Sequence, residues 1–244
     1  MFALNSPRPM TKSLRVLAAL LGYPDALMRS YLAEMSELLR EERALSPARR
    51  AEIGVLIDTL QRGDPLQIEA SYVELFDRGR ATSLHLFEHV HGDSRERGPA
   101  MIDLGQTYAK AGLILAEGEL PDYLPAVLEF VSTQPPGEAT AFLGEMAHIL
   151  NAIFGALQQR NSAYASVLGA LLELAGEQAQ PTAPAAEESL DESWAEPPVF
   201  GGCSAKGQSQ PGQAQAIHLV QLPQSPRPAR TVGAQTNPQS GVVA

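Results

Sequence analysis

Apolar residues recur at helical spacing along most of the first 176 residues. Leu14, Leu17 and Leu21 open the pattern, and residues 28–39 continue it with apolar side chains at i, i+3, i+4, i+7, i+10 and i+11. Spacing of this kind collects the apolar side chains on one face of an α-helix. The pattern therefore predicts a first helix that ends at Gly22 and a second helix that follows it.

Polar side chains suited to capping a helix N-terminus stand before the periodic segments. Pro47 and Pro65 each follow such a side chain at the first helical position, where proline loses no hydrogen bond. Behind the caps, apolar faces predict helices that contain residues 53–60, 68–76 and 124–131. The expected caps are Thr11 or Ser13, Asp25, Ser46, Asp64 and Asp122.

The later helices are predicted from longer apolar stripes. Residues 101–112 keep helical period, and Gly105 and Gly112 on that face indicate close contact with a neighbouring helix. Residues 142–157 and 164–175 predict two long helices after a Pro-Pro-Gly break. Since no period-two alternation is long enough to build a sheet, we expect an all-α body, a single helical bundle over residues 11–176.

Composition changes after Gly176, where Ala, Gln, Pro, Ser and Gly dominate and the apolar period disappears. Such a segment buries too little apolar surface to offset the entropy lost on ordering. We therefore expect residues 177–244 to form a long, largely disordered, flexible tail. Within it, residues 190–200 place acidic side chains around the single tryptophan, Trp194, and form a candidate docking segment.

Charge and cysteine content narrow the choice of partner. The chain has 18 Lys plus Arg against 28 Asp plus Glu, a formal net charge of −10. This charge repels phosphate backbones, so we expect no nucleic-acid partner, and it favours a basic peptide.

Cys203 is the single cysteine, so no disulfide can form within the chain. No apolar run reaches the ~18–20 residues that cross a bilayer, and we expect a soluble, cytoplasmic protein with no direct membrane insertion.

A histidine-rich stretch raises an enzymatic alternative. Residues 85–89 spell H-x-x-E-H, a pattern found in one class of zinc peptidase. On a helix, His85 and His89 would share one face, and Glu88 would activate a zinc-bound water. A catalytic zinc needs a third protein ligand, however, and a pattern of three residues is weakly specific. We therefore predict no catalytic residue, no metal and no other cofactor, and we keep a zinc-dependent hydrolase as the alternative.

A longer block around this stretch resembles a known family. The segments that carry the resemblance are SYVELFDRGRATSLHLFEHVHGDSRERGPAMIDL (71–104), GL (112–113), ELPDYLPAVLEF (119–130) and WAEPPV (194–199). They resemble the assembly chaperones of respiratory nitrate reductase, within the wider TorD/DmsD group of redox-enzyme maturation proteins. The sequence departs from the family pattern at His85, where tyrosine is frequent, and at Pro99, where glutamine is familiar. The first departure argues against zinc, because a ligand is not exchanged in this way.

The resemblance implies an all-helical fold of the TorD-like type and a cytoplasmic chaperone without an active site. Its client would be the apo catalytic (alpha) subunit of respiratory nitrate reductase, bound chiefly through its N-terminal peptide, within the apo alpha–beta complex. The chaperone would hold this subunit for molybdenum cofactor insertion, final assembly and membrane docking.

The resemblance also suggests where a client peptide binds. In the wider group a hinge motif of Asp followed by His contributes to peptide binding, and Asp122-Tyr123 occupies that place here. An amphipathic leader helix needs an apolar floor and, if the leader is basic, an acidic rim. The helical stripe that holds Tyr72 and Phe76 also favours a plain core position. The predicted client-binding residues are Tyr72, Phe76, Glu88, His89, Asp93, Glu119, Leu120, Asp122 and Tyr123.

Overall fold

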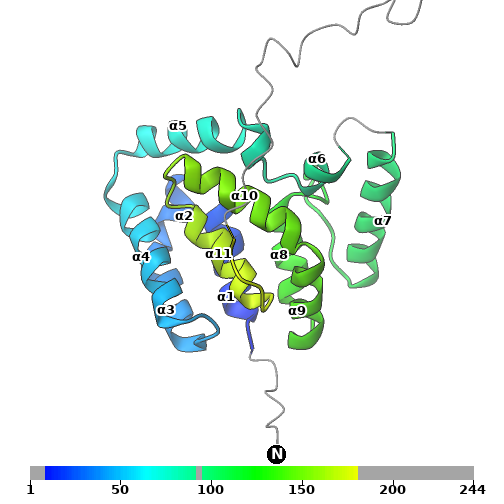
Figure 1. Cartoon of the computed structure of the whole chain (residues 1–244), viewed down its shortest axis with the longest axis horizontal. Coiled ribbons are helices and arrows are strands. Elements are labelled where there is room, and N and C mark those ends of the chain that lie inside the picture. The colour runs from blue at the N-terminus through cyan, green and yellow to red at the C-terminus, as the bar shows by residue number, and fades with distance from the viewer. Residues whose placement is uncertain (1–8, 92–94, 181–244) are drawn as a thin grey trace, which may run out of the picture. The chain divides into compact units, whose positions relative to one another are not determined.

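The computed structural model describes residues 9–91 and 95–180, and over these ranges the chain forms helices joined by loops, the longest of which runs from residue 111 to 123, with no β-strand (Figure 1). The all-α prediction is therefore confirmed for this part of the chain. The helices are α1 (Thr11–Leu21), α2 (Ala26–Ser30), α3 (Leu32–Glu42), α4 (Pro47–Arg62), α5 (Pro65–Phe76), the 3-10 turn η1 (Arg80–Thr82), α6 (Leu86–Val90), α7 (Arg97–Lys110), α8 (Leu124–Ser132), α9 (Pro136–Glu145), α10 (Ala147–Gln159) and α11 (Ala165–Leu174).

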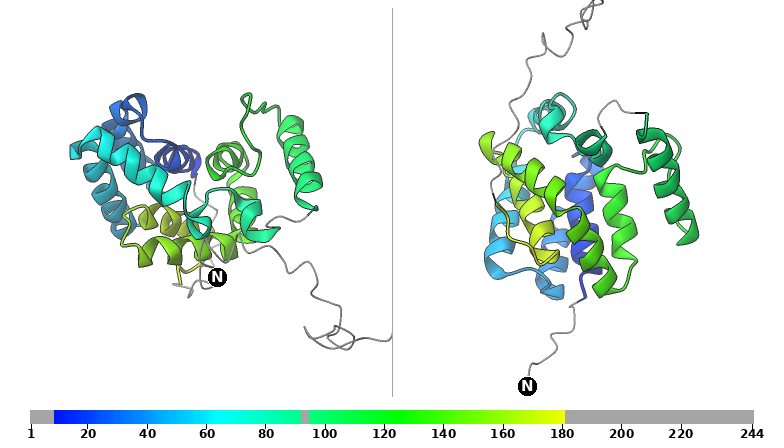
Figure 2. Two further views of the ribbon diagram at one scale, coloured as in Figure 1. Left: turned by 90° about the horizontal axis from the view of Figure 1, so that it is seen from above. Right: turned by 45° about the vertical axis from the view of Figure 1, so that its right-hand side comes forward.

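The first helix lies at the centre of the packing. It contacts α3, α8 and α11, and Leu14, Leu17 and Leu21 on it are fully buried. The two turned views in Figure 2 show α1 surrounded by these helices. Burying a leucine side chain contributes about 1.5–3 kcal/mol, so the apolar stripe that predicted this helix also holds the neighbouring helices together.

Three predicted caps are confirmed. The carboxylate of Asp25 accepts a hydrogen bond from the amide of Met28 at 2.7 Å. Ser46 caps α4 and Asp64 caps α5 in the same way, each accepting from the amide three residues later at 3.2 Å and 3.1 Å. Pro47 and Pro65 occupy the first helical position in α4 and α5, as the sequence predicted.

The predicted cap of α1 is wrong. Met10 occupies the N-cap position, and its side chain makes no capping bond. The carboxylate of Glu42, at the end of α3, instead accepts hydrogen bonds from the amides of Lys12 at 3.0 Å and Ser13 at 2.6 Å. The acceptor that satisfies these free amides thus comes from a side chain about thirty residues away, which no local pattern indicates.

Two helices that the sequence predicted as continuous are broken. The segment 28–39 divides at Tyr31 into α2 and α3, and the segment 142–157 divides at Met146 into α9 and α10, which meet at 65°. The break at Met146 lets α9 contact α8 while α10 packs along α11. Apolar spacing survives such a bend because both halves still turn an apolar face to the core.

The helix α7 lies at the edge of the body, beyond α8, in every view of Figures 1 and 2. The prediction that its glycines pack closely on a neighbouring helix is wrong. A Cβ atom placed on Gly105 would have only the ring of Pro121, a loop residue, within reach, at 3.8 Å. Gly112 lies in the turn after the helix and has a φ of 80°. Gly112 therefore serves to reverse the chain, which glycine does without strain.

Among the described residues, no single helix is long and apolar enough to cross a membrane. The bent pair α9 and α10 reaches that length and apolar composition only when the two helices are taken together. The predicted tail boundary at residue 177 falls shortly after α11, and it stays a prediction. The docking segment 190–200 and Cys203 lie outside the described residues.

Candidate functional site

Two segments far apart in the sequence meet through their backbones beside α6. The amide of Leu124 donates to the carbonyl of Leu84 at 2.8 Å, and the amide of Leu86 donates to the carbonyl of Asp122 at 3.0 Å. This pair of bonds sets His85 opposite Tyr123 in an isolated antiparallel bridge. The histidine-rich stretch and the Asp-Tyr pair, singled out separately in the sequence, therefore form one site.

Asp122 is the centre of this site. Its side chain is 0% exposed, and its carboxylate accepts a hydrogen bond from the amide of Phe87 at 3.1 Å. The same carboxylate lies 3.4 Å from Nδ1 of His85 and 3.7 Å from a guanidinium nitrogen of Arg97. A buried carboxylate needs such donors, because an ionised group without partners is costly to remove from water.

Asp122 does not cap its own helix, so that part of the prediction is wrong. The N-cap of α8 is Tyr123, without a side-chain capping bond, whereas Asp122 bonds the second amide of α6. The carboxylate thus satisfies the N-terminus of a five-residue helix that begins 36 positions earlier in the chain. It lies in the interior instead of on the rim of a groove.

The imidazole of His85 is tied to Asp122 on one side and lies near Tyr123 on the other, with 5.3 Å between the ring centroids. The hydrogen bond that His85 donates to Asp122 raises the pKa of His85 above its ordinary value of 6.5, and partial burial only partly opposes this. Because a carboxylate can only accept, Nδ1 of His85 is the donor in this bond. His85 thereby links the described part of the histidine-rich stretch to the buried carboxylate.

Tyr72 and Tyr123 extend the site into the core. The hydroxyl of Tyr72 donates to the carbonyl of Leu21 at 2.7 Å, so the hydroxyl of Tyr123, 3.3 Å away, donates to Tyr72. Burial raises the pKa of both phenols. Tyr72 and Phe76 are buried, with 4.8 Å between their ring centroids, so these two predicted client-binding residues take the core position that the helical stripe also favoured.

The H-x-x-E-H residues do not have the geometry expected for a zinc helix. His85 precedes α6 in an extended conformation, so His85 and His89 do not share a helix face. Nε2 of His89 donates to the carbonyl of Ser83 at 2.8 Å, and Glu88 lies 3.5 Å from Arg97. In the described ranges, no group of three His, Cys, Asp or Glu side chains is arranged to hold a metal ion.

The surface of the site combines a small pocket with an exposed loop. The pocket has a volume of about 400 Å³, and its walls include His85, Glu88 and Arg97. In the loop before Asp122, Glu119 is exposed and Leu120 is 44% exposed. Of the predicted client-binding residues, Glu119 and Leu120 are therefore exposed, Glu88, His89 and Tyr123 are half-buried, and Asp93 lies outside the described residues.

Three residues of the site were missed by the sequence reasoning. Arg97 contacts both Glu88 and Asp122, Ser83 receives the bond from His89, and the hydroxyl of Tyr108 donates to the carbonyl of Pro121 at 2.8 Å. Arg97 and Tyr108, on α7, thus tie this helix to the segment that carries Asp122. Only Arg97 had a signal in the sequence, because it lies close to the histidines and carboxylates of residues 85–93.

The fold and the site together define an all-α protein in which a buried carboxylate joins the short helix α6 to a loop segment 35 residues away. The family model described as nitrate reductase delta subunit matches residues 42–170, more than half of the chain. The chain belongs to this family.

Relatives of known description agree with the assignment. The nitrate reductase molybdenum cofactor assembly chaperone NarJ of Escherichia coli K12 is 46% identical over 160 residues, which cover 66% of this chain and 68% of that protein. NarW of the same strain is 40% identical over 163 residues, covering 67% and 68%. NarJ of Bacillus subtilis 168 is 30% identical over 158 residues, covering 64% and 84%. NarW and the Bacillus protein carry the same chaperone description, marked as probable.

Proposed function

We propose that this protein is a cytoplasmic chaperone that binds the N-terminal segment of the apo catalytic subunit of respiratory nitrate reductase. It holds that subunit, within the apo alpha–beta complex, for molybdenum cofactor insertion and for final assembly and membrane docking. It acts by binding and carries out no bond-breaking step. The support is its family membership together with the names of its relatives, several of which are described as nitrate reductase molybdenum cofactor assembly chaperones.

The observation that carries the proposed binding site is the exposed edge beside the buried carboxylate. Glu119 and Leu120 are exposed on a loop whose next residues are anchored by Tyr108, His85 and the backbone of Leu84. An apolar and an acidic side chain on a fixed loop suit a peptide with apolar and basic residues. Asp122, whose side chain is fully buried, acts from behind by fixing the loop against α6.

Titration calorimetry with a synthetic peptide of the catalytic subunit's N-terminus tests this site. We expect saturable binding that weakens in Glu119→Gln and in Leu120→Ser. Two matched controls come from the same loop: Glu117→Gln removes an exposed carboxylate, and Ile114→Ser removes an apolar side chain that is 96% exposed.

Equal losses in the test and control variants would place the peptide elsewhere on the protein. The absence of any heat with the unmodified chain, at peptide concentrations well above micromolar, would remove the proposed client itself.

A further inference from the structure

Four arginines gather around η1 in a chain that is acidic overall. A pocket of about 630 Å³ lies between α5 and the end of α10 and has Arg78 and Arg160 on its walls. The pocket beside His85 shares Arg78 and adds Arg80 and Arg97. We call these two adjoining pockets the arginine surface. Its walls carry four arginines against three carboxylates, whereas the whole chain has a net charge of −10.

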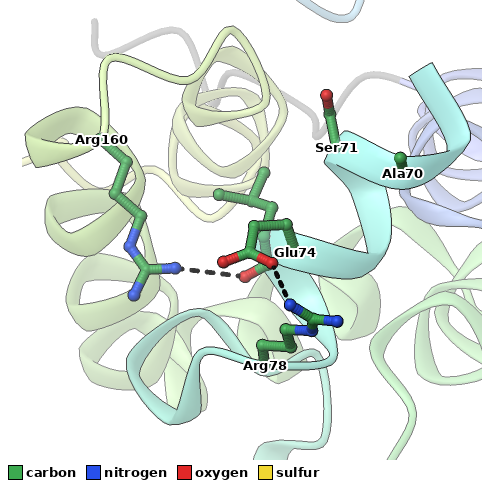
Figure 3. Close-up of a pocket in the computed structure, with 6 residues that line it drawn as sticks. Ala70, Ser71, Glu74, Arg78 and Arg160 are labelled. Carbon is green, nitrogen blue, oxygen red and sulfur yellow. Dashed lines mark hydrogen bonds and ion pairs between the residues drawn. The ribbon is translucent and has the colours of Figure 1, made fainter. Parts of the chain in front are cut away.

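The larger pocket has an apolar wall between two guanidinium groups. Arg160 extends from the end of α10 towards α5, where its Nη1 lies 3.5 Å from the carbonyl of Leu75 (Figure 3). Arg78 pairs with Glu74 at 2.9 Å, and its side chain is 73% exposed. Ala70 and Leu75 supply the aliphatic part of the wall. Such a pocket suits an apolar side chain that is flanked by carboxylates, because each guanidinium offers several donors to an acceptor oxygen.

The chain itself contains a segment of this chemistry. Residues 187–192 read EESLDE, in which four carboxylates flank Leu190, and no Lys or Arg occurs between residues 161 and 205. The described chain ends on the same helix that carries Arg160, because the amide of Gln180 donates to the side chain of Asn151 on α10 at 2.9 Å. Arg160 lies about 14 Å from Asn151 along the axis of α10 at ~1.5 Å per residue. The seven residues from 180 to 187 span up to about 25 Å.

We propose that residues 187–192 of the same chain dock on the arginine surface, with Leu190 over Leu75 and the carboxylates facing Arg78 and Arg160. Tethering favours this contact over one with a free acidic peptide, because a short linker holds the segment at an effective concentration in the millimolar range. The contact is electrostatic and exposed, so added salt weakens it. The docked segment borders the pocket that His85 and Glu88 line.

A spin label on the full chain tests the docking directly. The label is attached in Ser189→Cys, in a Cys203→Ser background so that the chain carries one thiol. We expect the label to broaden the amide NMR signals around Arg78 and Arg160, and not those around Arg40 on α3. The broadening should disappear when the four carboxylates are amidated in Glu187→Gln, Glu188→Gln, Asp191→Asn and Glu192→Gln. These changes lie in the docking segment and leave the helical body untouched.

Two further measurements keep the proposal falsifiable. Arg78→Glu should remove the broadening, whereas Arg40→Glu, an exposed arginine in a similar pair with Glu37, should leave it unchanged. Labelled chains mixed with unlabelled, isotope-enriched chains separate docking within one chain from docking between copies. Broadening between copies, broadening that survives amidation, or broadening spread evenly over the body would each overturn the proposal. No client is needed, so the outcome is independent of the proposed chaperone function.

Discussion

Replacing Asp122 removes the acceptor that joins α6 to the segment before α8. In Asp122→Ala the amide of Phe87 loses the carboxylate at 3.1 Å, and as the second amide of a helix it has no intrahelical partner. His85 and Arg97 lose the same carboxylate. A lost helix cap costs about 1 kcal/mol, and a lost hydrogen bond to a buried charge about 1.5–3 kcal/mol. We therefore expect the free energy of unfolding to fall by about 2–4 kcal/mol.

Urea unfolding followed by circular dichroism measures this loss. Asp58→Ala is the matched control, because Asp58 is a 58% exposed aspartate that pairs with Arg62 at 3.6 Å. We expect the control to change the free energy of unfolding by no more than about 0.5 kcal/mol, as surface pairs do. A similar small change in Asp122→Ala would refute the view that the buried carboxylate holds the two segments together.

The pH dependence of the same pair gives an independent check. Asp122 raises the pKa of His85 in the folded protein, so protonated His85 stabilises the fold. This contribution is fully present below the unfolded pKa of about 6.5 and is lost as the pH rises through the higher folded pKa. The stability difference between the wild type and Asp122→Asn should therefore be larger at about pH 6 than at about pH 8.5. An NMR titration in which the pKa of His85 is the same in both proteins would contradict this reasoning.

Two further predictions concern bonds between distant segments. Glu42→Gln should lower the free energy of unfolding by about 1 kcal/mol because it weakens the cap of α1, whereas Glu41→Gln, which breaks only an exposed pair with Lys12, should change it by less than about 0.5 kcal/mol. Tyr72→Phe should cost about 1–2 kcal/mol in urea unfolding, since the buried carbonyl of Leu21 loses its hydroxyl donor. An unchanged urea midpoint in either variant would count against the bond concerned.

Helix positions were largely readable from the sequence because capping and apolar spacing are local properties. Ser46-Pro47 and Asp64-Pro65 start α4 and α5 where predicted, and α1 ends at Gly22. The breaks at Tyr31 and Met146 were not readable, since an apolar stripe continues through a bend. At Met146 the break lets α9 contact α8 while α10 packs along α11.

The site was only partly readable. The sequence drew attention to the histidine-rich stretch and to Asp122-Tyr123, and the structure brings them together. It gave no sign that Asp122 caps α6 rather than α8, or that Arg97 contacts both Glu88 and Asp122, because these bonds join residues 25 to 35 positions apart in the chain or lie between different helices. The hydrogen-bond partner of a side chain that is distant in sequence depends on the path of the whole chain.

By itself, the sequence determined that the protein is helical, where most helices begin, and which family it resembles, because each of these rests on neighbours along the chain. The tertiary structure alone decided which side chains are buried and which face solvent. It placed Tyr72 and Phe76 in the core, Asp122 beneath a short helix, and Glu119 and Leu120 at the surface. The physical reason is burial. The sequence allowed Asp122 to lie on the acidic rim of a groove, but a carboxylate that is removed from water and surrounded by three donors serves as a structural acceptor.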